Sequence, residues 1–359
     1  MSVEIIATLG PSSINPGTIS QLISSGCKDL RINLSHSNKE SLRSYVNVCR
    51  QANCIPSLDT QGAQLRVIDL SSQHYTKNDE IVIAFKSKLA GKDFSSLGTN
   101  FLVINHAEAL EQFAEGDYLR IDFSGLLIQI TSINTNQNFA TGRVIEAGTC
   151  QLNRALDVVD KHINLEHLTE FDRYAIDQIP GIGSTRVYYS FAEESANINS
   201  LRELLPNTVS IISKIESIKG LQNMESIIEA SDGILIDRGD ISRQISISLV
   251  PLVTNSVINA CLKKRTPVYV ATNVLDSMMK SPLPSRAEIS DIWNLLEKGV
   301  DGIVLAAEVA IGDNPVQSIA TVKHMCTLME YQSNNLSFLS QHKMLSKDVG
   351  LGGQLSTWL

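Results

Sequence analysis

The sequence predicts a (β/α)8 TIM barrel with a small all-β domain inserted after the third strand. Eight apolar, strand-like runs alternate with helical runs along most of the 359 residues, which is the pattern of this barrel. The alternation is interrupted between 67 and 160, where short stretches of period-two hydrophobicity follow one another. The stretch 209–240 shows the repeating unit most clearly, because a strand, a helix and a second strand succeed one another within about thirty residues.

The barrel strands are predicted from short runs rich in Val and Ile, and all but the third are followed directly by a helical run. These runs lie at 3–9, 29–34, 54–58, 187–191, 209–216, 233–236, 267–272 and 301–306. Helices are expected at 18–25, 38–51, 169–178, 193–205, 246–263, 286–298 and 315–331. Ser37 is expected to cap the second of these helices, with Glu40 three residues later completing a capping box.

The inserted segment shows alternating apolar residues at 81–85, 118–123, 126–130 and 140–144. We therefore assign 1–66 and 161–333 to the barrel and 67–160 to the inserted β domain. The remaining residues, 334–359, are polar and contain glycine, so we expect this C-terminal tail to be either an ordered arm or disordered.

Composition and charge exclude several classes of function. The net charge of −8 and the lack of a basic block argue against nucleic acid as the main partner. No apolar run is long enough to span a bilayer, and the N-terminus lacks the shape of a signal peptide. The six cysteines are scattered without a C-x-x-C pair, which suits a reducing compartment. We therefore expect a cytoplasmic protein that acts on small molecules, with homo-oligomer formation left open.

The residues expected to form a site lie at the carboxyl ends of the predicted strands, where barrel enzymes carry their active sites. Lys214 and Glu216 are two residues apart on one strand, so their side chains point to the same side. Parallel strands end at the same edge, so Glu216 and Asp240 are expected to meet there. Two carboxylates beside a lysine suit a hard divalent cation, Mg²⁺ or Mn²⁺, next to a phosphate. A surface ion pair is the alternative interpretation of the same residues.

Other strand ends add oxygen ligands and positive charge. A set of oxygen-bearing side chains with one full charge suits a monovalent cation: Asn33, Ser35, Asp59 and Thr60. Arg31 and Lys214 add positive charge, which implies a polyanionic substrate, most simply a phosphorylated acid. Gly239 and Asp240 are expected to begin a helix whose free N–H groups can hold a carboxylate or phosphate.

Three further polar residues end predicted strands, and each has an ordinary structural explanation. Thr272 alone is more often a packed strand hydroxyl, and Ser190 and Glu308 alone are more often structural. The functional prediction therefore depends on the whole set of strand-end residues.

Eight short motifs run through the predicted barrel. They are T-L-G-P-S-S from position 8, R-I-N-L-S-H from 31, L-D-T-Q-G-A-Q-L-R from 58, I-S-K-I-E-S from 212, A-S-D-G-I-L-I-D-R-G-D from 230, V-A-T-N-V-L-D-S-M from 270, S-R-A-E-I-S-D from 285 and L-A-A-E-V-A-I-G-D from 305. In content and order they resemble the pyruvate kinase family over essentially the whole barrel. The inserted β segment is similar to the mobile lid of that family.

The resemblance implies transfer of phosphate from phosphoenolpyruvate to ADP, with pyruvate and ATP as products and with Mg²⁺ (or Mn²⁺) and K⁺ as cofactors. It implies that Lys214 stabilises the phosphoryl group, that Arg31 contacts the phosphate, and that Thr272 lies near the enolate carbon. It implies that Glu216 and Asp240 bind magnesium and that potassium is bound by Asn33, Ser35, Asp59 and Thr60. The rest of the substrate would contact Ser190, Gly239, Asp240 and Thr272. The nucleotide would contact Asn33, His36 and Arg66.

The sequence also departs from the family pattern. Gln61 and Ile311 stand where the family usually carries lysine, and the turn at 149 lacks another lysine. Gln64 occupies a position where Glu or Lys tracks with potassium dependence, so this requirement is left open. The family's C-terminal regulatory domain is expected to be missing. From the lost lysines we expect ordinary affinity for phosphoenolpyruvate, with ADP weakly bound or replaced by another acceptor.

Two rival hypotheses remain beside the phosphotransferase. The first is an enzyme that acts on the phosphoenolpyruvate or pyruvate enolate with a different second substrate. The second is a non-catalytic paralogue kept as a binding protein, which the retained Lys214, Glu216, Asp240 and Arg31 argue against.

Overall fold

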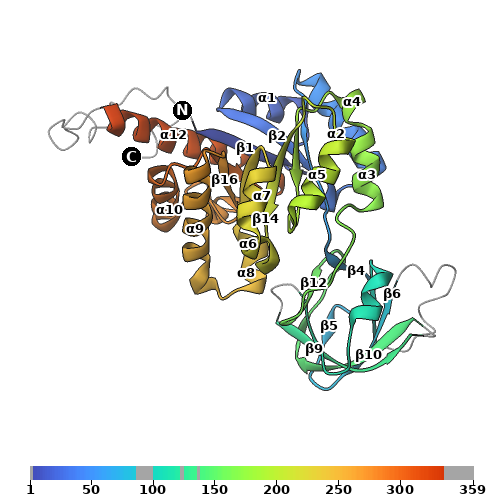
Figure 1. Cartoon of the computed structure of the whole chain (residues 1–359). Coiled ribbons are helices and arrows are strands. Elements are labelled where there is room, and N and C mark those ends of the chain that lie inside the picture. The colour runs from blue at the N-terminus through green and yellow to red at the C-terminus, as the bar shows by residue number, and fades with distance from the viewer. Residues whose placement is uncertain (1–2, 86–99, 122–124, 136–137, 335–359) are drawn as a thin grey trace.

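The computed structural model describes residues 3–85, 100–121, 125–135 and 138–334, and these residues form two closed β-barrels (Figure 1). The first barrel has eight strands in the order β1-β17-β16-β15-β14-β13-β3-β2. Its strands are β1 (Glu4–Leu9), β2 (Cys27–Asn33), β3 (Ser57–Asp59), β13 (Arg186–Tyr189), β14 (Ser210–Ile215), β15 (Gly233–Asp237), β16 (Val268–Ala271) and β17 (Gly302–Leu305). All neighbouring strands pair in parallel, so their carboxyl ends share one end of the barrel. The predicted (β/α)8 barrel is confirmed.

Helices surround the first barrel (Figure 1). They are α1 (Pro16–Ser24), α2 (Lys39–Gln51), α3 (Glu170–Asp177), α4 (Ile179–Ile182), α5 (Ser195–Leu204), α6 (Ile218–Gln222), α7 (Met224–Ala230), α8 (Arg238–Gln244), α9 (Val250–Lys264), α10 (Arg286–Glu297), α11 (Ala307–Ala310) and α12 (Pro315–Asn334), with the 3-10 turns η1 (Leu34–His36), η5 (Ile247–Leu249) and η6 (Asp276–Met279). Within the described residues, none of the helices has the length and apolar character needed to cross a membrane.

Two layers of apolar side chains hold the first barrel together. The larger layer packs the helices onto the outer face of the strands and includes Ile19 and Leu22 of α1. The smaller layer fills the barrel interior and includes Tyr188 and Tyr269, which are almost fully buried. This division follows from the strands, because successive side chains point to opposite faces and both faces are covered. The polar residues at the carboxyl ends of the strands lie directly above this interior apolar layer.

The second barrel follows β3 in the chain, as the sequence predicts for the insertion, and has its own apolar core. Its strand order is β10-β6-β7-β4-β12-β8-β9. The strands are β4 (Leu65–Leu70), β6 (Glu80–Phe85), β7 (Phe101–Ile104), β8 (Tyr118–Ile121), β9 (Leu126–Asn134), β10 (Phe139–Glu146) and β12 (Ala155–Val158), with η4 (Ala107–Gln112) between β7 and β8 and a separate pair of β5 (His74–Tyr75) and β11 (Gly148–Thr149). Figure 1 shows this barrel as a separate body joined to the first near β4 and β12.

Some expectations fall outside the described residues. The last two residues of the strand predicted at 118–123 lie there, and so do residues 335–359 of the predicted tail. The domain limits at 66 and 160 stay a prediction, as does the movement of the second barrel as a lid.

The predicted cap of the second helix is wrong. Asn38 is the N-cap of α2, and its Oδ1 accepts the Ser41 N–H at 2.9 Å while Ser41 Oγ accepts the Asn38 N–H at 2.8 Å. Ser37 does not cap the helix because its hydroxyl instead donates to the Asn33 carbonyl at 2.9 Å. The strand predicted at 54–58 is also displaced to Ser57–Asp59, since the chain turns at Asn53 with a φ of +55°.

Candidate active site

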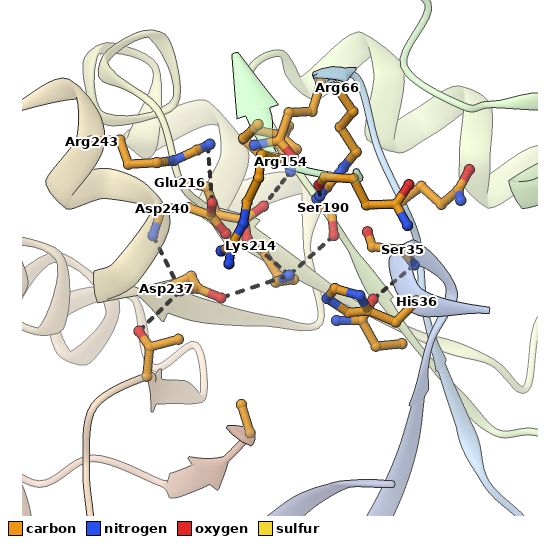
Figure 2. Close-up of a pocket in the computed structure, with 18 of the residues that line it drawn as sticks. Ser35, His36, Arg66, Arg154, Ser190, Lys214, Glu216, Asp237, Asp240 and Arg243 are labelled. Carbon is orange, nitrogen blue, oxygen red and sulfur yellow. Dashed lines mark hydrogen bonds and ion pairs between the residues drawn. The ribbon is translucent and has the colours of Figure 1, made fainter. Parts of the chain in front are cut away.

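A cavity of about 240 Å³ lies at the carboxyl ends of the first barrel's strands, on the side of the second barrel (Figure 2). Most of its walls are charged or polar. The lining residues are Arg31, Asn33, Ser35, His36, Gln61, Gln64, Arg66, Asn153, Arg154, Ala155, Ser190, Phe191, Lys214, Glu216, Asp237, Asp240, Arg243, Thr272 and Ala306. The cavity therefore draws on both barrels, and strong charges of both signs meet inside it.

Lys214 lies at the centre of the buried charges. Its Nζ is 2.8 Å from Glu216 Oε1, 3.2 Å from Asp59 Oδ1 and 3.9 Å from Asp237 Oδ2. It also donates to Ser190 Oγ at 3.1 Å. Burial alone would lower the pKa of Lys214, but the surrounding carboxylates outweigh burial and raise the pKa above its ordinary value. The ammonium is therefore charged throughout the physiological range.

Three carboxylates form a cluster beside Lys214. One ligand atom from each of Glu216, Asp237 and Asp240 lies within 4.8 Å of the others. Burial raises the pKa of Glu216 to about 8; Lys214 opposes the increase, and the two aspartates add to it. Burial also raises the pKa of Asp240. Phe191 has a φ of +51° and donates its N–H to Glu216 Oε2 at 2.7 Å, so a strained residue fixes this carboxylate.

Arg31 and Asp59 form a buried pair under the cavity. Arg31 NH1 is 3.0 Å from Asp59 Oδ2, and the guanidinium lies 5.3 Å from the ring centre of Tyr188. Burial alone would lower the pKa of Arg31, but Asp59, together with Tyr188, Asp237 and Glu216, outweighs burial and raises the pKa. Thr60 Oγ1 accepts the Ser190 N–H at 2.9 Å. Arg31 lines the cavity, whereas Asp59 and Thr60 do not and instead support it from below.

The other predicted oxygen ligands lie at the end of β2. Asn33 and Ser35 line the cavity, and Asn33 Oδ1 accepts the Ser35 N–H at 2.8 Å. Asp59 is engaged with Arg31 and Lys214. Two of the four predicted potassium ligands thus face the cavity and two lie beneath it. The potassium site stays a prediction.

Thr272 holds the start of α8 in an unusual way. The residue follows β16 with a φ of +69°, and its Oγ1 accepts the Gly239 N–H at 2.7 Å and donates to Asp237 Oδ1 at 3.0 Å. The Asp240 N–H points to Asp237 Oδ1 at 3.5 Å. The expectation that the N–H groups of Gly239 and Asp240 are free is therefore wrong, because side chains from two strand ends cap them. A substrate would have to displace Thr272 to reach the Gly239 N–H.

Basic residues line the side of the cavity nearest the second barrel. Figure 2 shows Arg66 and Arg154 directed toward the carboxylates from this side. The side chain of Arg243 on α8 is 2% exposed, and its guanidinium lies 3.0 Å from Asp240 and 3.6 Å from Asp157 of β12. One guanidinium thus contacts carboxylates from both barrels. His36 also lines the cavity, and burial together with Arg66 lowers its pKa.

The structure brings most of the predicted site residues into this one cavity. Those that line it are Arg31, Asn33, Ser35, His36, Arg66, Ser190, Lys214, Glu216, Asp240 and Thr272. Glu308 does not line it, and its carboxylate accepts the N–H groups of Val274, Leu275 and Ala306. The structural interpretation of Glu308 therefore applies.

Asp237 and Arg243 are among the lining residues that had no predicted role. Asp237 stands at a strand end three residues before Asp240, which is a signal that the sequence does contain. Arg243 is three residues after Asp240, a helical spacing that brings the two side chains together once α8 is recognised. Nothing in the sequence indicates its contact with Asp157.

The fold and the cavity together define a TIM-barrel protein with a carboxylate cluster, a buried lysine and several arginines at the carboxyl ends of its strands. Comparison with known proteins then gives the family. Residues 1–319 match the family model for the pyruvate kinase barrel domain, and the chain belongs to the pyruvate kinase family. The resemblance seen in the motifs is confirmed.

Curated relatives come from bacteria, archaea and plants. The chain is 30% identical to a pyruvate kinase of Bacillus licheniformis over 97% of its own length and 60% of the relative. It is 29% identical to a pyruvate kinase of Thermoplasma acidophilum, over 95% of this chain and 60% of the relative. It is 30% identical to plastidial pyruvate kinase 3 of Arabidopsis thaliana, over 90% of this chain and 57% of the relative. The chain thus spans about 60% of the length of these relatives.

Proposed function

We propose that the chain is a pyruvate kinase-type phosphotransferase, which moves phosphate from phosphoenolpyruvate to ADP. The observation that carries this proposal is the position of Lys214. Its charged ammonium stands between a three-carboxylate cluster and a pair formed by Arg31 and Asp59, at the mouth of the barrel. Phosphoryl transfer needs little covalent chemistry from a protein, and such an arrangement of fixed charges is what it requires.

The side chains divide the cavity into three parts in this proposal. Arg31 and Lys214 hold the phosphate of phosphoenolpyruvate. The far end of that substrate meets the residues at the ends of β13, β15 and β16 that line the cavity, namely Ser190, Asp240 and Thr272. The nucleotide is held toward Asn33, His36 and Arg66, and Arg154 adds a further cation on that side.

Glu216 and Asp240 suit a hard divalent cation, since they offer carboxylate oxygens within 4.8 Å of one another. Mg²⁺ or Mn²⁺ bound there would neutralise negative charge on the transferred phosphate. A potassium ion near Asn33 and Ser35 belongs to the same proposal.

The proposed reaction proceeds by attack of a terminal ADP oxygen on the phosphorus of phosphoenolpyruvate. The bond between phosphorus and the enol oxygen breaks, which yields ATP and the enolate of pyruvate. Lys214 and Arg31 stabilise the negative charge on the phosphoryl oxygens as the transfer proceeds. A proton then adds to the enolate carbon on the side of Thr272.

A second candidate is an enzyme that acts on the same enolate with another second substrate. Gln61 favours it, because this side chain donates to the Leu34 carbonyl at 3.0 Å and accepts from Thr169 Oγ1 at 2.8 Å. Gln61 is therefore a structural link and supplies no charge to a nucleotide. Arg66 and Arg154 favour the phosphotransferase, since they place positive charge in the cavity where a diphosphate needs it.

One pair of assays separates these candidates. ATP formation from phosphoenolpyruvate and ADP is measured with Mg²⁺ and K⁺ present, and proton exchange at the methyl carbon of pyruvate is measured in parallel. ATP formation supports the phosphotransferase, and exchange without ATP formation supports the second candidate. The absence of both reactions would indicate the non-catalytic paralogue and refute the proposal.

A further inference from the structure

Asp237 is the member of the carboxylate cluster to which neither the motifs nor the proposed reaction gives a role. It is the last residue of β15 and the N-cap of α8, and only 5% of it is exposed. Its Oδ1 accepts from Thr272 Oγ1 at 3.0 Å, and its Oδ2 lies 3.9 Å from Lys214 Nζ. These contacts keep the carboxylate in the cavity, beside Glu216 and Asp240.

A second observation indicates that a ligand fills this cavity. Gln64 lines the same cavity and is 5% exposed, yet neither its Oε1 nor its Nε2 has a hydrogen-bond partner among the residues that the structure describes. Polar groups that are buried in this way are normally paired, so an amide left without a partner marks a place where a polar ligand or its water binds. Gln64 thus points to an occupant of the cavity independently of the carboxylates.

We propose that Asp237 is a third protein ligand of the divalent cation, and that the chain therefore binds Mn²⁺ or Mg²⁺ in the absence of any phosphorylated substrate. Hard cations take six or more oxygen ligands, and the number of anionic ligands sets their affinity. Three carboxylates supply three anionic oxygens before a substrate arrives, with water completing the coordination. A site with two carboxylates would depend more strongly on the oxygens of the substrate.

The proposal concerns the metal of the proposed function, but it does not need phosphoryl transfer to occur. The competing explanation is that Asp237 only positions Thr272 through their hydrogen bond. Two substitutions separate these explanations. Asp237→Asn removes the negative charge and keeps both an acceptor for Thr272 and a good N-cap. Thr272→Val removes the hydrogen bond and keeps the carboxylate.

The experiment is a calorimetric titration of the whole chain with MnCl₂, without substrate or nucleotide, for the wild type and each variant. Asp232→Asn is the matched control, because Asp232 precedes the opposite end of the same strand and is engaged with Arg202 and the Ile211 N–H. Far-UV circular dichroism and thermal unfolding confirm that each variant is folded. ATP formation is measured separately, so that loss of the proposed function and loss of metal binding are recorded independently.

We expect one Mn²⁺ per chain in the wild type and the Asp232→Asn control. Asp237→Asn should weaken binding by more than about tenfold, because even the loss of an outer-shell group around a metal commonly costs that much. Thr272→Val should weaken it less than Asp237→Asn does. Equal Mn²⁺ affinity in the wild type and Asp237→Asn would overturn the proposal, and so would a wild type that binds no Mn²⁺ until phosphoenolpyruvate is added.

Discussion

Replacement of Lys214 by methionine tests the proposed mechanism most directly, because the substitution removes the ammonium and nearly preserves the length of the side chain. The ammonium lies 2.8 Å from Glu216 and 3.2 Å from Asp59, in a position to stabilise charge on a phosphate at the cavity. Removal of one such group from a preorganised site typically costs about 10²–10³ in turnover, or about 3–4 kcal/mol. We expect turnover to fall at least that far. The Kd for phosphoenolpyruvate should change less than about fivefold, since Arg31 remains and binding alone does not use the transition-state contact.

The same substitution affects stability. The Lys214 side chain is 7% exposed, so its loss leaves buried carboxylates without their shared cation. Breaking a buried pair of this kind typically costs roughly 3–5 kcal/mol. We expect a loss of that size in the urea unfolding free energy of the metal-free protein. Saturating Mg²⁺ should recover part of it, because the cation takes over the role of countercharge.

The assays are single-turnover ATP formation and calorimetric titration with phosphoenolpyruvate. Lys264→Met is the matched control, because Lys264 also contacts two carboxylates, Glu225 and Glu229, but lies on α9 away from the cavity. Its turnover should equal that of the wild type, and its stability should change little, because exposed ion pairs of this kind contribute little. Wild-type turnover in Lys214→Met, with the variant folded, would remove this lysine from the mechanism.

Three further predictions concern metal, pH and nucleotide. Glu216→Gln and Asp240→Asn should each raise the half-saturating Mg²⁺ concentration sharply, since each removes one anionic ligand; unchanged metal titrations of activity in both variants would show these carboxylates to be structural. The pKa of Glu216 is raised from its ordinary 4.5 to about 8, so the metal-free folded chain keeps a proton that the unfolded chain has lost. Its stability should therefore fall between about pH 5 and pH 8, while Mn²⁺ affinity should rise across the same window; flat profiles for both quantities would contradict the assignment. ADP should bind more weakly than phosphoenolpyruvate, because each of the missing lysines costs roughly 1 kcal/mol, or about fivefold. Arg154→Gln should weaken the binding of ADP further and leave the binding of phosphoenolpyruvate unchanged. Calorimetric titration with each ligand in turn tests this prediction, and a loss of affinity for phosphoenolpyruvate rather than for ADP would contradict it.

The sequence predicts the barrel and the general position of the site because both depend on local patterns. Alternating strands and helices determine the fold class, and the polar residue at each strand end can be read directly. The proximity of Lys214 and Glu216 follows from their two-residue spacing on one strand, and the structure gives 2.8 Å between them. The meeting of Glu216 with Asp240 follows from the parallel pairing of β14 and β15.

Other features depend on contacts between distant segments, which periodicity does not encode. The Asp157 contact of Arg243 requires the placement of the second barrel against α8. The capping of Gly239 by Thr272 requires a left-handed backbone conformation at a threonine, which its residue type disfavours. The cap of α2 fails for a simpler reason, since Ser37 and Asn38 are both good capping residues and tertiary context chooses between them.

Asp59 limits which amino-acid substitutions this protein can accept at Arg31 and Lys214. It has no solvent exposure, and its two oxygens contact Arg31 at 3.0 Å and Lys214 at 3.2 Å. The two cations come from different strands, yet they share this one countercharge. Substitutions at the two positions are therefore not additive, because the first alters the charge balance that the second meets. We therefore expect evolution by single substitutions to retain Arg31, Asp59 and Lys214, since replacing them requires simultaneous changes at all three positions.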